Sequence, residues 1–230
     1  MAVVETERHG QIFIIRMNRP ERLNAMGREL MEALAEQWTL FRKDPDLEVA
    51  IFTGTGRGFC AGEDMKESLE EGAPGAKEIS IEDPFMSMEL EKPVIGAING
   101  FAMGGGMETA LSCDIIMASE NAKFALPEVK VGFFAAAGGV QRLSRQIGKK
   151  AALEMILTGR SVDAAEALKL GIINEVFPQA ELLDKAIQKA EVIAGNCPSS
   201  VKYSLEALNH MDQLEEMASA LEKAMSLSTY

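Results

Sequence analysis

Strand and helix signals alternate over residues 1–118, and this alternation limits the possible folds more than any other feature of the chain. Short apolar runs, typical of buried strands, are separated by segments in which apolar residues recur at helical spacing. The strand runs cover residues 11–17, 47–53, 92–99 and 115–118. Such alternation requires crossover connections, so it predicts an α/β protein with a mainly parallel sheet.

The clearest helix lies between the first two of these runs. Its apolar residues share one helical face and are Leu30, Leu34, Trp38 and Phe41. Asp44-Pro45 ends this helix, because proline cannot continue it. Residues 3–8 and 11–17 predict an opening hairpin that turns at His9-Gly10, residues 54–62 predict a loop, and helical segments extend from there to about Leu90.

After residue 139 the pattern changes to helices only. The predicted helices cover residues 140–146, 149–158, 162–170, 179–195, 198–209 and 212–227. Ser161 is a suitable N-cap for one of them, and Gly171 is a suitable stop. We therefore expect a core domain over residues 1–139 and a helical C-terminal region over residues 140–230.

Composition is ordinary for a soluble globular protein. Apolar residues make up 47% and charged residues 25% of the 230-residue chain. No apolar run approaches the roughly 20 residues that a membrane-spanning helix needs. The N-terminal residues lack the charged start and apolar core of a signal peptide, so we expect a cytoplasmic protein without a membrane partner.

Cysteine and histidine are too few for several kinds of site. The three cysteines, Cys60, Cys113 and Cys197, are widely spaced, which argues against a disulfide framework and a zinc site. The two histidines, His9 and His210, have no serine or cysteine context typical of a catalytic triad. We therefore expect no metal site and no triad hydrolysis.

The net charge of −12 opposes broad nucleic-acid binding, which needs a basic face. It still permits a phosphorylated ligand, because a few local cations can bind one. Each candidate cation has two interpretations, a phosphate contact or a solvated surface charge. The candidates are Arg19, Arg22, Arg57 and Lys66.

Three consecutive glycines, Gly104 to Gly106, follow the strand run at 92–99. Without a Cβ they let a ligand approach the backbone, and the last of them can open a helix whose first N–H groups would bind an oxyanion. Glu108 would lie in the first turn of that helix, as expected for proton transfer beside a carbonyl group. The alternative is a tight turn, with Glu108 only stabilising the helix dipole.

A glycine-rich segment at Gly54 to Gly58 does not form a dinucleotide motif. The third glycine of that motif would fall at position 59, which is Phe59, and no glycine–lysine pair forms a phosphate-binding loop. We therefore expect no nicotinamide cofactor.

Four segments in order resemble the crotonase, or enoyl-CoA hydratase/isomerase, family. They are Arg19 to Ala25, Phe59 to Met65, Asn99 to Glu108, and Ala125 to Arg142. The resemblance implies a spiral of ββα units with a helical trimerisation region, and a homotrimer or a dimer of trimers. It also implies an acyl-coenzyme A (CoA) thioester as substrate, with no separate cofactor.

The resemblance also implies roles for individual residues. The backbone amides of Glu63 and Gly105 would form the oxyanion hole, and Glu108 and Glu128 would be the catalytic acid–base pair. The remaining residues that would contact CoA or the acyl group are Arg22, Leu23, Ala25, Ala61, Asp64, Met65, Gly104, Pro127 and Ala136. Isomerases of the family often keep one carboxylate at the second position, so two glutamates favour hydration.

The sequence departs from the family pattern in several places. Ala135 and Ala136 stand where hydratases commonly have Pro-Gly, and Glu63 stands where alanine is common. Phe133 and Phe134 either shape an acyl pocket or pack into the core, and we expect core packing. The chain ends at Tyr230, before the position of the family's final helix, so we expect that helix to be absent.

The resemblance therefore implies reversible hydration of a 2-enoyl-CoA to a 3-hydroxyacyl-CoA through an oxyanion-stabilised enolate. The nearest alternative is isomerisation of a 3-enoyl-CoA to a 2-enoyl-CoA. A more remote alternative is a non-catalytic relative that binds CoA or RNA, although the acidic charge opposes RNA.

Overall fold

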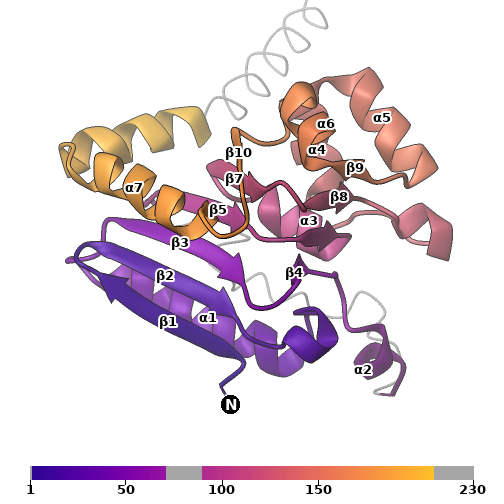
Figure 1. Ribbon diagram of the computed structural model, residues 1–230, viewed down its shortest axis with the longest axis horizontal. Coiled ribbons are helices and arrows are strands. Elements are labelled where there is room, and N and C mark those ends of the chain that lie inside the picture. The colour runs from indigo at the N-terminus through magenta and orange to yellow at the C-terminus, as the bar shows by residue number, and fades with distance from the viewer. Residues whose placement is uncertain (1, 71–89, 210–230) are drawn as a thin grey trace, which may run out of the picture.

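Two β-sheets form the centre of the protein in the computed structural model, which describes residues 2–70 and 90–209 (Figure 1). The large sheet contains, in spatial order, β1 (Val4–His9), β2 (Ile12–Met17), β3 (Val49–Gly54), β5 (Val94–Ile98), β7 (Ile115–Ser119) and β10 (Glu175–Phe177). The small sheet contains β4 (Gly58–Cys60), β6 (Phe101–Met103), β8 (Lys123–Ala125) and β9 (Val162–Asp163).

Helices cover these sheets. The α-helices are α1 (Arg28–Lys43), α2 (Met65–Glu70), α3 (Gly105–Ala110), α4 (Gly139–Ile147), α5 (Lys149–Thr158), α6 (Ala164–Leu170) and α7 (Leu182–Ala194). Two short 3₁₀ helices are η1 (Pro20–Arg22) and η2 (Glu128–Val131), and residues 198–209 are also helical.

The large sheet is buried on both faces. Strands β2, β3, β5, β7 and β10 are parallel, and only β1 pairs antiparallel at the edge. Phe13 and Ile15 face the core that contains α1, whereas Ile12 and Ile14 face the core that contains α7. Figure 1 shows α1 and α7 on opposite faces of this sheet. Double burial explains why the strands are nearly continuous apolar runs.

The core on the α1 side contains a cluster of aromatic rings. Leu30, Leu34, Trp38 and Phe41 of α1 are all buried. The ring centroids of Trp38 and Phe52 lie 5.0 Å apart, edge to face, which is a favourable aromatic geometry. This predicted helix is confirmed, and Asp44 is its C-cap.

Consecutive strands enter the two sheets alternately. β3, β5 and β7 join the large sheet, and β4, β6 and β8, each following one of them, join the small sheet. Within the small sheet β4, β6 and β8 are parallel neighbours. The chain therefore advances as a spiral of strand pairs, as the resemblance implied.

Several local predictions need correction. The segment 54–62 contains the strand β4, and the region predicted as purely helical supplies β9 and β10. The N-cap of α6 is Asp163, not Ser161, because the Asp163 carboxylate accepts a hydrogen bond from the Glu166 amide. The stop at Gly171 is confirmed by its left-handed backbone, φ 82°.

Some predictions fall outside residues 2–70 and 90–209. The helix predicted at residues 212–227 and most of the helical segment predicted before Leu90 are among them. Within the described ranges no helix is both long and apolar enough to cross a membrane. The division at residue 139 and the cytoplasmic location stay predictions.

Candidate active site

Three turns meet at one edge of the small sheet. The residues that follow β4 include Gly62 and Glu63, those that follow β6 include Gly104 and Gly105, and β8 leads to Glu128. Because these strands are parallel neighbours, their carboxyl ends lie at the same edge. The sequence-predicted oxyanion and carboxylate groups are thus brought together from segments far apart in the chain.

The turn after β4 packs directly against the start of α3. A Cβ atom at Gly62 would lie 2.8 Å from the Met103 carbonyl oxygen and 3.5 Å from the Gly105 nitrogen. The Glu63 nitrogen lies 4.0 Å from the position of a Cβ on Gly105. The backbone amides of Glu63 and Gly105 are therefore close neighbours. Their role as oxyanion donors stays a prediction.

The helix α3 begins one residue earlier than the sequence indicated. Gly104, with φ 55° and ψ −127°, is the N-cap, and the helix starts at Gly105 rather than at Gly106. This backbone conformation is one that only glycine adopts readily. Glu108 lies in the first turn, as predicted.

Backbone hydrogen bonds join the loop before α1 to the turn after β4. The Ala61 amide donates to the Leu23 carbonyl at 3.0 Å, and the Met26 amide donates to the Gly62 carbonyl at 2.8 Å. The Asp64 amide then donates to the Met26 carbonyl at 3.0 Å. These bonds place the predicted CoA-contacting residues of both segments side by side.

Buried polar side chains fix this pair of segments. Leu23 and Asn24 have left-handed backbones, with φ 52° and 54°. The fully buried Asn24 amide donates to the Thr55 and Gly58 carbonyls at 3.0 and 2.9 Å. Arg19 donates to the Ala25 carbonyl and to the Asp64 carboxylate at 2.9 and 3.3 Å. Such satisfied buried groups specify one conformation of the loop.

Glu108 is almost completely buried, with 4% of its surface exposed. Its Oε1 accepts a hydrogen bond from the Gly139 amide, at the start of α4, at 2.9 Å. Burial raises the pKa of this carboxyl group, and the charge of Glu128 raises it further. The Gly139 and Ala137 amides and the Arg142 guanidinium oppose this shift.

Glu128 lies against the glycine turn of α3. Its Oε1 is 3.3 Å from the position of a Cβ on Gly104. Its Oε2 is buried, with no hydrogen-bond partner among the residues that the structure describes. Burial also raises the pKa of this carboxyl group. A buried carboxylate oxygen without a partner is suited to bind a water molecule or a substrate proton.

The site therefore has two sides. We call residues 61–64 with 104–105 the amide side, because they present backbone N–H groups. We call residues 127–139 with Glu108 the carboxylate side, because they present and bind the two carboxyl groups. Donors for a developing negative charge beside two carboxyl groups of raised pKa suit proton transfer next to a carbonyl group.

Some sequence-predicted residues have different surroundings from those expected. Arg19 binds Asp64 inside the protein, with 15% and 7% of the two side chains exposed, so Arg19 is not a surface cation ready for phosphate. The carboxylate of Asp64 likewise has a partner within the loop. Arg57 and Lys66 are exposed, and either could meet a phosphate group.

The other predicted ligand contacts surround the same edge and differ in exposure. Ala25 and Gly104 are buried, and Leu23, Ala61 and Pro127 are partly exposed. The exposed members of the predicted set are Arg22, Met65 and Ala136. No bound ligand tests these contacts, so they stay predictions.

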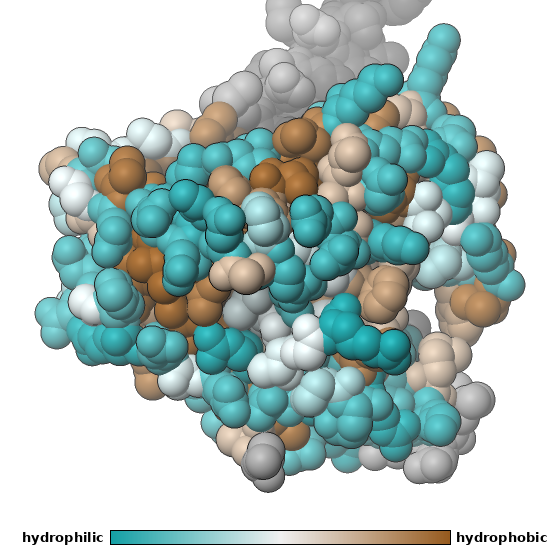
Figure 2. All heavy atoms as spheres, viewed as in Figure 1, coloured by the Kyte–Doolittle hydropathy of each residue, from teal (hydrophilic) through white to brown (hydrophobic). Residues whose placement is uncertain are grey.

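The core packing expected for Phe133 and Phe134 is wrong. Their side chains are 64% and 67% exposed, and Val131 beside them is 65% exposed. Figure 2 shows hydrophobic side chains at the edge of the molecule where the segment after β8 lies. Their carboxylate-side location leaves the alternative of an acyl-binding role.

Sequence reasoning missed Asn24, Gly139 and Arg142 as parts of the site. Asn24 carried one usable signal, because asparagine is enriched at left-handed positions of tight loops. Gly139 and Arg142 carried none, since their importance depends on contacts with Glu108 and the loop before α4.

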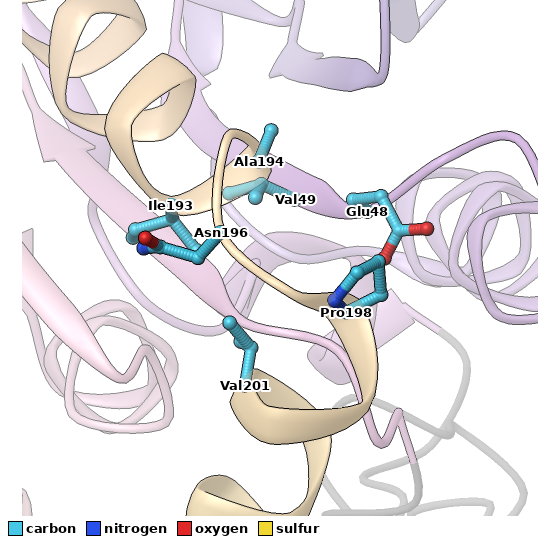
Figure 3. A pocket seen from close by; sticks show the side chains of 7 residues that line it. All are labelled: Glu48, Val49, Ile193, Ala194, Asn196, Pro198 and Val201. Carbon is cyan, nitrogen blue, oxygen red and sulfur yellow. The ribbon is translucent and has the colours of Figure 1, made fainter.

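Two cavities in the described parts of the chain lie away from this site. One, where the segment after α7 meets the start of β3, has a volume of about 10 Å³, space for about one water molecule (Figure 3). Another, of about 180 Å³, lies beside it around Lys92 and Lys202. Within residues 2–70 and 90–209 no cluster of histidine, cysteine or acidic residues could hold a metal ion.

Comparisons with known proteins agree with this geometry. The family model described as enoyl-CoA hydratase/isomerase matches residues 7–230. A probable mitochondrial enoyl-CoA hydratase of Dictyostelium discoideum is 40% identical over 205 residues, which is 89% of this chain and 74% of that protein. The (E)-benzylidenesuccinyl-CoA hydratase of Thauera aromatica is 41% identical over 207 residues, 89% of this chain and 81% of that protein.

A solved structure gives the same result for the fold. The crystal structure of an enoyl-CoA hydratase from Mycobacterium tuberculosis superimposes with a TM-score of 0.87 at 35% sequence identity. The match covers 93% of this chain and 84% of the crystallised one.

Proposed function

This chain belongs to the enoyl-CoA hydratase/isomerase family, and we propose that it adds water reversibly to a 2-enoyl-CoA thioester. The crotonase-like fold predicted from the sequence is confirmed by the family match and by the solved structures. The product would be a 3-hydroxyacyl-CoA. Relatives named as hydratases support this reaction over others of the family.

The observation that carries the proposal is the pair of carboxyl groups at the start of α3. Glu108 is bound to the Gly139 amide, and Glu128 has a buried oxygen without a partner among the described residues. Burial raises the pKa of both groups, and the negative charge of Glu128 adds to the effect on Glu108. Carboxyl groups of raised pKa exchange protons more readily near neutral pH.

The amide side would supply the electrostatic part of catalysis. Attack of water at C3 transfers negative charge to the thioester oxygen, and this oxygen would accept hydrogen bonds from the amides of Glu63 and Gly105. Because these donors belong to turns fixed by backbone bonds, they need little rearrangement when the charge develops.

The proton transfers balance within the carboxyl pair. One carboxylate accepts a proton from water as the oxygen of the water bonds to C3, and a carboxyl group donates a proton to C2. The net change is the addition of one water molecule across the C2–C3 double bond. No oxidant or separate cofactor enters this scheme.

The direct test is the product formed from 2-butenoyl-CoA in water labelled with ¹⁸O. We expect a 3-hydroxyacyl-CoA that carries the label, identified by mass spectrometry. A parallel assay uses a 3-enoyl-CoA as substrate. Conversion to a 2-enoyl-CoA without incorporation of the label, and no hydration of 2-butenoyl-CoA, would instead assign the isomerase reaction. Acyl-CoA binding without turnover, or RNA binding at physiological salt, would favour the non-catalytic relative.

We also propose that the protein assembles as a homotrimer or a dimer of trimers. Several large apolar side chains on the C-terminal helices are exposed in the single chain. They include Leu157, Val192, Tyr203 and Leu208, at 68%, 68%, 66% and 65% exposure. Apolar groups of this kind are commonly buried between identical subunits. Analytical ultracentrifugation should give a trimer or hexamer mass, and a stable monomer would contradict the proposal.

A further inference from the structure

Two backbone amides at and before the start of α4 act on Glu108, those of Gly139 and Ala137. Gly139 donates to Oε1 of Glu108 at 2.9 Å, and there is no room for a side chain at this position. A Cβ on Gly139 would lie 2.9 Å from Cγ of Glu108 and 2.9 Å from Cβ of Ala135. The direction of the Gly139 N–H group therefore contributes to where the carboxylate lies.

The direction of the Gly139 N–H group is set by its own peptide group, which includes the Gly138 carbonyl, and by the preceding one, which includes the Ala137 carbonyl. The Arg142 amide donates to the Gly138 carbonyl at 2.8 Å. In a trans peptide the Gly138 carbonyl and the Gly139 N–H point in opposite directions, so this bond turns the N–H out of the helix toward Glu108. Gly138 itself has a left-handed backbone, φ 99°, which few other residues adopt.

The side chain of Arg142 fixes the remaining peptide group. Its Nη1 donates to the Ala137 carbonyl at 2.7 Å, and the guanidinium occupies the space that a side chain on Gly138 would need. Arg142 thus binds the loop on both sides of Gly138, once through its backbone and once through its side chain. Charge-assisted hydrogen bonds of this kind are stronger than neutral ones.

The same guanidinium places a positive charge near the catalytic pair. Among the described residues, the charged groups that act on Glu108 are Glu128 of η2 and Arg142 of α4. Burial lowers the pKa of Arg142, and the charge of Glu108 raises it in return. The attraction between these two groups opposes both the burial of Glu108 and the repulsion from Glu128.

We propose that Arg142 is a positioning residue of the hydration reaction, which directs the Gly139 amide at Glu108 and stabilises the ionised form of that carboxylate. This inference rests on the proposed function. Arg142 acts through Glu108 and the loop, and it does not need to touch the substrate.

The test compares Arg142→Gln and Arg142→Lys with Arg145→Gln, which removes a charge from an exposed position of the same helix. Hydration of 2-butenoyl-CoA is measured from about pH 5 to about pH 9. We expect Arg142→Gln to lower kcat about tenfold with little change in KM, the size of a lost charge-assisted bond. The low-pH side of its kcat profile, the acidic limb, should move to higher pH, because the Glu108 carboxylate loses a favourable positive charge beside it.

Arg142→Lys separates charge from geometry. Lysine keeps the charge but not the planar fork, so we expect the acidic limb of the wild type with a kcat that stays lowered. A purely structural role would change the yield or stability of the variants and leave the limb unmoved. Should Arg142→Gln fail to fold, a wild-type kcat in Arg142→Lys would overturn the proposal. A lowered kcat in Arg142→Lys would support it if the melting temperature and the low-pH side of the activity profile match those of the wild type, and a lowered melting temperature would instead show a purely structural role.

A second measurement does not depend on activity. In a Glu128→Gln background, ¹³C NMR titration reports the pKa of Glu108 directly, and adding Arg142→Gln should raise it. An unchanged Glu108 titration, with kcat within about twofold of wild type, would overturn the role of Arg142 and leave the hydration proposal intact. Absence of hydration by the wild-type protein would instead remove the proposed function, while the titration still tests the effect of Arg142 on Glu108.

Discussion

The amide side and the carboxylate side of the site are built in different ways. The amide side consists of backbone groups, and its neighbouring loop is fixed by buried polar side chains such as Asn24 and Asp64. The carboxylate side presents the carboxyl groups of Glu108 and Glu128, and its segment 127–139 has Phe133 and Phe134 exposed to solvent. Donors for a developing charge must not move, whereas the segment that surrounds an acyl group can vary with the substrate.

This difference has a practical meaning for the effect of substitutions. On the amide side, we expect a substitution to lower activity wherever the new side chain would displace the backbone. On the carboxylate side, we expect only the two glutamates and the groups that bind them to be indispensable.

The largest expected effect tests the carboxylate side. Glu108→Gln and Glu128→Gln should each lower kcat for hydration by about 10² or more, because each removes an acid–base group. Glu120→Gln, on an exposed glutamate at the end of β7, is the control and should keep full activity. Near wild-type turnover in either site variant, with circular dichroism showing an intact fold, would remove that residue from the mechanism.

The next prediction compares a glycine from each side. Gly62→Ala should lower kcat by about 10², because the new Cβ would lie 2.8 Å from the Met103 carbonyl and would displace the Glu63 amide. Gly132→Ala requires a similar left-handed backbone, φ 82° against 95°, but its Cβ would meet nothing within 4 Å.

Both glycine variants carry a backbone strain of about 1 kcal/mol, so the difference between them isolates the contact with Met103. We expect Gly132→Ala to keep kcat within about threefold of wild type. Steady-state kinetics, measured on both variants at temperatures well below their melting points, gives the two kcat values to be compared. Equal losses in the two variants would mean that the amide side is no more constrained than the carboxylate side.

A smaller effect concerns stability. Asn24→Ala should lower the free energy of unfolding by about 2–3 kcal/mol, since it removes a fully buried amide that donates to the carbonyl groups of Thr55 and Gly58. Phe134→Ser should change it by less than about 0.5 kcal/mol, because the ring is 67% exposed. Urea denaturation of both variants gives the comparison. A large loss of unfolding free energy in Phe134→Ser would show that the Phe134 ring is buried in solution, for example against another subunit.

The smallest expected effect is the pH dependence of stability. Burial raises the pKa of Glu108 and Glu128 above the ordinary value of 4.5, so the folded protein binds protons that the unfolded chain has released. The free energy of unfolding contributed by these groups therefore falls as the pH rises from 4.5 through their folded pKa values. The double variant Glu108→Gln, Glu128→Gln should gain stability relative to wild type over this interval. Parallel stability curves for the two proteins would contradict the prediction.

Long periodic elements of the fold could be predicted from the sequence. The apolar stripe of α1 packs against one face of the large sheet, and Asp44-Pro45 marks the end of the helix. The strands β4, β6 and β8 could not be recognised, because each has only three residues and depends on pairing with distant neighbours. Periodicity needs more residues than these strands contain.

The candidate site could be predicted to the extent that its chemistry depends on backbone and residue type. Glycines next to a glutamate indicated an oxyanion site, and the resemblance supplied the second glutamate. The exposure of Phe133 and Phe134 was not predictable, because hydrophobicity alone does not tell which face of a short segment is covered. The contact of Arg142 with Ala137 was equally hidden, since it depends on a left-handed turn at Gly138.

The alternation of strands between the two sheets has a consequence for how such a chain can change in length. Residues 62, 104 and 127 are far apart in the sequence, yet they follow neighbouring strands of one small sheet. Interstrand hydrogen bonds keep such neighbours about 4.8 Å apart, whatever length of chain joins them. Lengthening a connecting segment costs only about 0.6 kcal/mol for each doubling. Insertions between the strands can thus accumulate while the distances among the groups at this edge of the sheet stay the same.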